Sequence, residues 1–109
     1  MKMLTKGAIN TVANLAEFKQ LVAGPTPVLV DFSAQWCGPC KAIFPVLTKL
    51  AAANEEITFV KIDVDEHPDV AQQYGVTAMP TFMLFKAGEK KGEMKGANAS
   101  GLKNLVTMA

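Results

Sequence analysis

Apolar residues recur along the chain in two alternating patterns, one typical of strands and one typical of helices. A short strand is predicted at Gly7–Asn10. Asn14 then caps a predicted helix, Glu17 completes a capping box three residues later, and Gly24-Pro25 ends the helix. Pro27–Phe32 is rich in β-branched residues with little polar alternation, which predicts a strand buried on both faces, as in a parallel sheet.

The alternation continues through the middle of the chain. A helix is predicted from about Cys37 to about Ala53 on apolar residues at helical spacing, and Pro45 should kink it. Ile57–Val64 predicts another strand. Pro68 begins a short helix that ends near Tyr74-Gly75.

A hairpin and a helix complete the pattern. Thr81–Phe85 predicts a strand, Gly88 turns the chain, Glu89–Lys95 pairs back, and a last helix runs from about Ser100 to Val106. Crossover helices between parallel strands lie on both faces of a central sheet, and the hairpin adds antiparallel strands. We therefore predict an α/β fold with a mixed sheet.

The length of 109 residues predicts a single domain over residues 1–109, because it is too short for two domains of ordinary size. Half of the residues are apolar, enough for one core without metals or structural disulfides. The formal net charge is +1 and all 11 basic residues are lysines, which gives no argument for nucleic acid or an anionic membrane surface. No apolar run reaches membrane-spanning length or follows the lysines near Met1, so we expect no membrane segment, no secretory leader and a cytoplasmic protein.

The two cysteines, Cys37 and Cys40, lie where the buried strand passes into a helix. Residues three apart on a helix share a face, so the sulfurs can bond with little backbone movement. Cys37, at or just before the helix N-terminus, would lie beside unpaired N–H groups that favour its thiolate, whereas Cys40 should keep its proton longer. We therefore predict a thiol–disulfide oxidoreductase: the Cys37 thiolate attacks a disulfide in a partner protein, and Cys40 then attacks Cys37 and releases the reduced partner.

Two other uses of the cysteines fit less well. A zinc site needs four ligands, and only His67 is available besides the pair, so we expect no metal. A purely structural disulfide across so small a loop would constrain little of the unfolded chain.

The stretch around the cysteines resembles the active-site segment of the thioredoxin family: Val30-Asp31-Phe32-Ser33-Ala34-Gln35-Trp36-Cys37-Gly38-Pro39-Cys40-Lys41. The resemblance continues in order through Lys61-Ile62-Asp63-Val64-Asp65, Met79-Pro80-Thr81-Phe82 and Gly96-Ala97, and covers essentially the whole chain. It implies the thioredoxin fold, with a central mixed five-stranded sheet flanked by four helices. It also implies reduction of protein disulfides and a contribution to cell redox homeostasis. The chain carries no visible motif for a nucleotide or a metal, so we expect no bound cofactor.

Asp31 is a carboxylate inside the apolar run Val28–Phe32. Burial disfavours its charged form and should raise its pKa; the alternative is a strand-end aspartate that reaches solvent. The resemblance makes it the buried acid behind the cysteines, and we assign it to proton transfer with Cys40 through water. Lys61 matches the lysine near that acid in the family, with a solvated strand-end lysine as the alternative. Ser33 stands where many bacterial members have tryptophan, a difference common in eukaryotic members that we expect to leave the chemistry unchanged.

Residues around the cysteines are expected to bind the partner. A proline at Met79-Pro80 removes a ladder donor, so it marks a sheet edge or a sharp turn. The resemblance implies a cis bond packed against the disulfide, with the Met79 backbone free to pair with an extended partner segment. Trp36 is either a core residue or, by resemblance, a partly exposed contact. The full expected set is Trp36, Gly38, Pro39, Ala78, Met79, Pro80, Gly96 and Ala97.

The resemblance also implies partners. An NADPH-dependent flavoprotein, thioredoxin reductase, would regenerate the dithiol, and clients would include ribonucleotide reductase, peroxiredoxin and methionine sulfoxide reductase. We expect a monomer that binds no nucleic acid. The alternatives are an oxidant or isomerase of the secretory or periplasmic type, which Pro39 argues against, and a binding subunit with idle cysteines.

Overall fold

The computed structural model describes residues 4–109; Met1, Lys2 and Met3, which the one-domain prediction and the leader argument include, lie outside the described residues. The predicted alternation of strands and helices is confirmed. The elements follow in the order β1 (Ile9–Asn10), α1 (Leu15–Ala23), β2 (Val28–Ser33), α2 (Gly38–Ala53), β3 (Thr58–Asp63), α3 (Pro68–Gln73), β4 (Thr81–Lys86), β5 (Glu89–Lys95) and α4 (Ala99–Val106).

The strands form one five-stranded mixed sheet in the order β1-β3-β2-β4-β5. The strands β1, β3 and β2 run parallel, whereas β4 runs antiparallel to β2 and β5. β2 is thus central, and all six of its residues are buried, which confirms the strand predicted to be covered on both faces. The fold class expected from the sequence, the thioredoxin fold, is confirmed.

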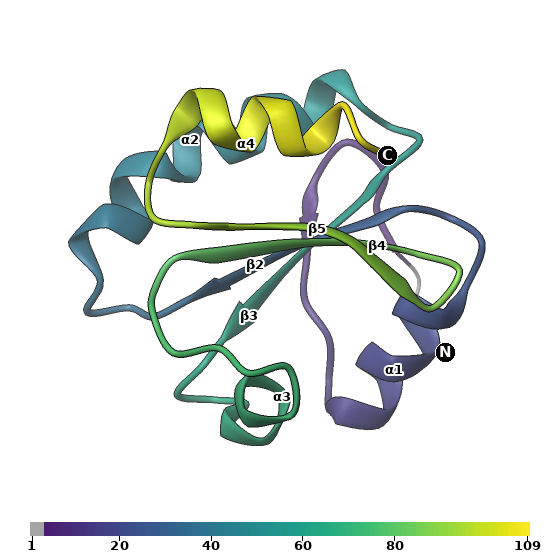
Figure 1. Ribbon diagram of the computed structural model, residues 1–109, viewed down its shortest axis with the longest axis horizontal. Helices are drawn as coiled ribbons and strands as arrows, with labels where there is room; N and C mark the ends of the chain where they lie inside the picture. The colour runs from purple at the N-terminus through teal and green to yellow at the C-terminus, as the bar shows by residue number, and fades with distance from the viewer. Residues whose placement is uncertain (1–3) are drawn as a thin grey trace.

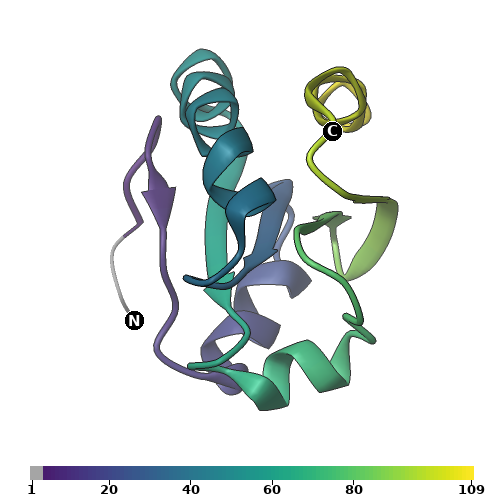
Figure 2. The ribbon, with the colours of Figure 1, turned by 90° about the vertical axis from the view of Figure 1, so that its left-hand side faces the viewer.

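Helices cover both faces of the sheet, with α2 and α4 on one side and α1 and α3 on the other (Figures 1 and 2). Alternate residues of β2 serve the two resulting cores: Val30 and Phe32 pack toward α1 and α3, and Leu29 packs toward α2 and α4. The same alternation turns Asp31 and Ser33 toward α2. A polar pair therefore lies under the helix that follows the cysteines.

The hairpin between β4 and β5 turns at Ala87 and Gly88, with φ angles of 53° and 81°. Two consecutive residues in the left-handed region are typical of the tightest hairpin turns. The turn is tied to the end of α1, because the N–H of Ala87 donates to the Gly24 carbonyl at 3.0 Å and the N–H of Gly88 to the Val22 carbonyl at 2.9 Å. Within residues 4–109, no helix combines the length and the apolar character that crossing a membrane requires.

Candidate active site

Cys37 and Cys40 form a disulfide at the start of α2, with their Cα atoms 5.3 Å apart. Cys37 is the N-cap residue, and its Sγ accepts a hydrogen bond from the Cys40 N–H at 3.1 Å. A sulfur thus takes the place that a serine or aspartate oxygen takes at many helix starts. Gly38 and Pro39 lie exposed in the first turn, where a proline costs no hydrogen bond. This position stabilises negative charge on Cys37 Sγ once the disulfide is reduced.

Both cysteines are buried, with exposed fractions of 4% for Cys37 and 5% for Cys40. Solvent exposure therefore does not distinguish Cys37 from Cys40 in the disulfide form. Any inequality between the two sulfurs comes from their places on the helix, because Cys37 caps the N-terminus and Cys40 lies inside the first turn.

Three connections meet at this end of the sheet: the one between β2 and α2, the one before β4 and the one between β5 and α4 (Figure 1). Met79 lies in the connection before β4 and packs against the cluster formed by Cys37, Cys40 and Ala34. The Met79-Pro80 bond is cis, as expected. The Pro80 carbonyl accepts a hydrogen bond from the Gly96 N–H at 2.8 Å. Of the two explanations for the proline, the sharp turn is right and the sheet edge is wrong, because β4 lies between β2 and β5.

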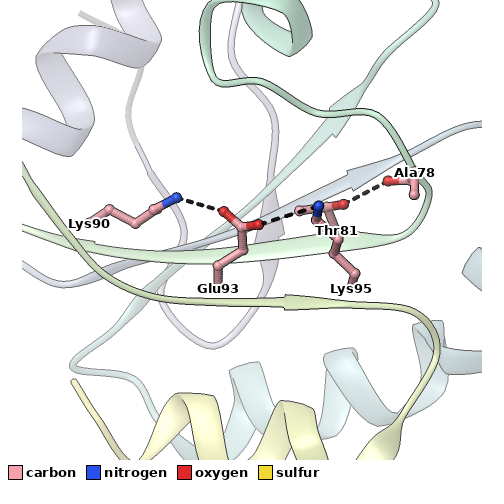
Figure 3. Close-up of polar contacts among 5 residues, drawn as sticks. All are labelled: Ala78, Thr81, Lys90, Glu93 and Lys95. Atoms are coloured by element: carbon pink, nitrogen blue, oxygen red, sulfur yellow. Dashed lines mark hydrogen bonds and ion pairs between the residues drawn. The ribbon is translucent and has the colours of Figure 1, made fainter.

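The segment before β4 is also anchored from within the sheet (Figure 3). The buried Thr81 hydroxyl donates to the carbonyl of Ala78 at 2.6 Å, while Ala78 itself is exposed. Beside Thr81, Glu93 on β5 pairs with Lys90 at 2.6 Å and lies 4.0 Å from Lys95. The backbone leading to Met79 is thus held in place by a partly buried hydrogen bond.

Trp36 lies on the surface beside the disulfide, with 67% of its area exposed, so the core-packing alternative is wrong. Its indole Nε1–H donates to Asp65 Oδ2 at 2.9 Å. Gly96 adopts a φ of +91°, in the left-handed region, with open space where a side chain would begin. Ala97 is exposed next to it. The residues expected to bind a partner are thus brought together around the disulfide, and their role in binding stays a prediction.

Asp31 lies behind the disulfide with only 2% of its area exposed, so the solvent-reaching alternative is wrong. It pairs in register with Lys61 on β3 and lines a cavity of about 190 Å³ together with Cys40 and Ser33. Burial raises the pKa of Asp31 to about 7, against the opposing pull of the Lys61 charge, which confirms the expected direction. Within residues 4–109, Asp31 Oδ1 and Ser33 Oγ have no hydrogen-bond partner. A cavity of this size with two unpaired polar atoms suits ordered water.

Three residues near the site were not singled out from the sequence as parts of it. Ser33 lines the cavity, a place that the alternation along β2 could have indicated. Phe44 also lines it, and its spacing of four residues from Cys40 on α2 was the available signal. Asp65 holds Trp36 from a connection 29 residues away, for which the sequence carried no signal.

Comparison with known proteins places the chain among thioredoxins. The Thioredoxin family model matches residues 9–108. The chain is 49% identical to Thioredoxin-2 of Pyricularia oryzae over 94% of its own length, but it spans only 60% of that relative. It is similar to the crystal structure of Malassezia sympodialis thioredoxin (TM-score 0.89, 39% identity, 100% of this chain and 98% of that one). It is also similar to a structure from work on the thiol resolving mechanism in yeast mitochondrial 1-Cys peroxiredoxin via glutathione/thioredoxin systems. The TM-score is 0.86 and the identity 44%, over 94% of this chain and 99% of that one.

Proposed function

Because the chain belongs to the thioredoxin family, we propose that it is a thiol–disulfide oxidoreductase that reduces disulfides of partner proteins through Cys37 and Cys40. One observation carries the proposal. The two sulfurs are bonded across the first turn of α2, and one of them caps the helix. A pair held at bonding distance by the helix start can open and close with little backbone movement.

The exchange runs in two steps from the reduced protein. The Cys37 thiolate attacks one sulfur of the partner's disulfide, forms a mixed disulfide and expels the partner's other sulfur as a thiolate. Cys40 then loses its proton and attacks Cys37 Sγ, which expels the second partner thiolate. The partner gains two electrons and, after protonation, two protons, while this chain closes its Cys37–Cys40 disulfide.

Asp31 accepts the Cys40 proton in the second step. The cavity that Asp31 and Cys40 share supports this role, and so does a carboxyl whose pKa of about 7 lies near the pH at which a base works best. The proton passes through water in the cavity. Lys61, which lies opposite Asp31 on the next strand, stabilises the charged carboxylate that Asp31 needs before it accepts the proton.

The partner's segment binds in extended form across the exposed surface around the disulfide. Within the described part of the chain, no backbone hydrogen bond uses the N–H or carbonyl of Met79, which supports pairing with a second strand. Trp36, Gly38 and Pro39 flank one side of the disulfide, and Gly96 and Ala97 leave room for the partner on the other side.

The family supports the partners proposed here, and the proposed compartment is the one expected from the sequence. Thioredoxin reductase, drawing on NADPH, returns the two electrons. A peroxiredoxin is a client, which the yeast structure's description supports, and ribonucleotide reductase and methionine sulfoxide reductase are further clients. The chain acts as a monomer in the cytoplasm. The same yeast structure concerns a mitochondrial protein, so a fluorescent fusion must distinguish the two compartments.

Reduction of insulin disulfides by dithiothreitol tests the proposal. The wild-type chain should accelerate it, and Cys37→Ser should not, because the attacking sulfur is gone. Cys40→Ser should instead accumulate mixed disulfides with clients, since the step that releases them is blocked. Equal acceleration by wild type and Cys37→Ser contradicts the catalytic assignment, and rapid client release from Cys40→Ser contradicts the division of roles.

A further inference from the structure

Lys61 lines two hollows, and each of them contains at least one carboxylate. On one side is the cavity that contains Asp31. On the other is a hollow of about 250 Å³ lined by Asp63, Glu66 and His67 among others. Within residues 4–109, Lys61 Nζ forms no ion pair with a carboxylate at 4.0 Å or less. The flexible ammonium therefore has a choice of acidic surroundings, and something other than an ion pair holds it on the Asp31 side.

The ring of Phe44 is the contact that the ammonium makes. Lys61 Nζ lies over this ring, 5.1 Å from its centroid, within the range of a cation–π interaction. Phe44 projects from α2 one turn beyond Cys40 and lines the Asp31 cavity. Its inner side packs against the core beneath α2 and α4, so the ring is supported from behind.

We propose that Phe44 is a positioning residue, whose ring holds the Lys61 ammonium at the Asp31 cavity and away from the acidic hollow. The proposal rests on the proposed function for the role that it gives Asp31 in the exchange. Its physical content, the placement of one charge beside another, can be measured without any activity.

Few charged or titratable groups share the cavity with Asp31, so the effect of the Lys61 charge on its pKa can be isolated. The titratable and charged groups that share the cavity are Lys61 from β3 and Lys41 and Cys40 from α2, and Cys40 does not titrate while it is in the disulfide. β4 places the uncharged Phe82 opposite Asp31. Since Lys61 lowers the pKa of Asp31 and burial raises it, an ammonium that leaves for the other hollow should let the pKa rise further.

The test is the titration of the Asp31 side-chain carboxyl, followed by ¹³C NMR in the disulfide form of the full chain. Phe44→Leu keeps an apolar side chain but removes the ring, and should raise the midpoint by about 0.3 to 0.7 pH unit, the size that an exposed cation–π contact supports. Phe44→Tyr keeps the ring and should leave the midpoint at the wild-type value. Phe44→Met is a second ring-free variant and should reproduce the shift.

Lys61→Met decides whether the ring works through the lysine. It should raise the midpoint on its own, and adding Phe44→Leu to it should cause no further shift. Leu50→Val trims a partly buried residue of the same helix that does not line the cavity, and should leave the midpoint unchanged.

An unshifted midpoint in Phe44→Leu, or a shift of equal size in the Lys61→Met background, overturns the proposal. A shift shared by Phe44→Tyr does so as well, because the ring would then be irrelevant. If the titrations come out as expected while Cys37→Ser still accelerates insulin reduction, the proposed function fails and the placement of Lys61 by Phe44 stands.

Discussion

Replacing Asp31 by asparagine measures what it costs the protein to bury this charge. Asparagine keeps the shape of the side chain and, like the neutral acid, carries no charge at any pH. In the folded protein, burial raises the pKa of Asp31 from 3.8 to about 7, in spite of Lys61. In the unfolded chain the carboxyl returns to its ordinary pKa of about 4.

Between those two values the folded protein holds a proton on Asp31 that the unfolded chain has released. Its stability therefore falls as the pH rises from about 4 to about 7 and levels off above that window. A separation of about 3 pH units, at about 1.36 kcal/mol for each unit, amounts to about 4 kcal/mol. With only 2% of the side chain exposed, solvent screens little of this cost. Asp31→Asn should therefore match the wild type near pH 4 and exceed its unfolding free energy by about 4 kcal/mol at pH 8.

Urea unfolding of both disulfide-form proteins, at steps from pH 4 to pH 8, gives the difference directly. Leu29→Val is the matched control, because Leu29 lies two residues earlier on the same face of β2 and carries no charge. It should cost about 1 kcal/mol at every pH. Wild-type and Asp31→Asn stabilities that run parallel across the range would refute the reasoning.

Three further outcomes are expected. Ala87→Asn should raise the unfolding free energy by about 0.5 to 1 kcal/mol, since asparagine tolerates the left-handed backbone that Ala87 adopts at φ 53°; a lower Tm contradicts this. Gly92→Ala should lower the unfolding free energy by about 1 to 3 kcal/mol, because the new Cβ would lie 2.6 Å from Leu105 Cδ1. The cost of Gly92→Ala should shrink when Leu105 is already alanine, and equal costs in both backgrounds would exclude that clash. Asp65→Ala should free the Trp36 indole and lower its fluorescence anisotropy, while Asp65→Asn, which keeps an acceptor, should not.

The helices and strands could be predicted because the spacing of apolar residues in each segment matches the face that the segment buries. β2 shows this most directly, since Val28–Phe32 is apolar at every position except Asp31, and such a run is buried only between layers on both faces. The strand order was beyond the reach of the pattern. It depends on pairings between segments far apart in the chain, such as β1 with β3, and no local spacing carries that information.

In the site, too, local features could be predicted from the sequence, and features that depend on distant segments could not. The burial of Asp31 followed from its apolar neighbours, whereas its pairing with Lys61 depends on a register between strands 30 residues apart. The resemblance to a family, rather than any spacing, indicated the exposure of Trp36. The near-equal burial of the two cysteines was not predicted, because Val64 and Met79, which pack against them, come from distant parts of the chain.

The disulfide belongs to neither of the two large apolar clusters that hold the helices to the sheet. It packs in a small third group with Ala34, Val64 and Met79. Its reactive atoms thus lie at the rim of the scaffold, outside the two clusters that pack the helices onto the sheet. Exchanging one thiol for a selenol, or grafting another reactive side chain at either position, should retune the chemistry while the scaffold beneath keeps its folding energy.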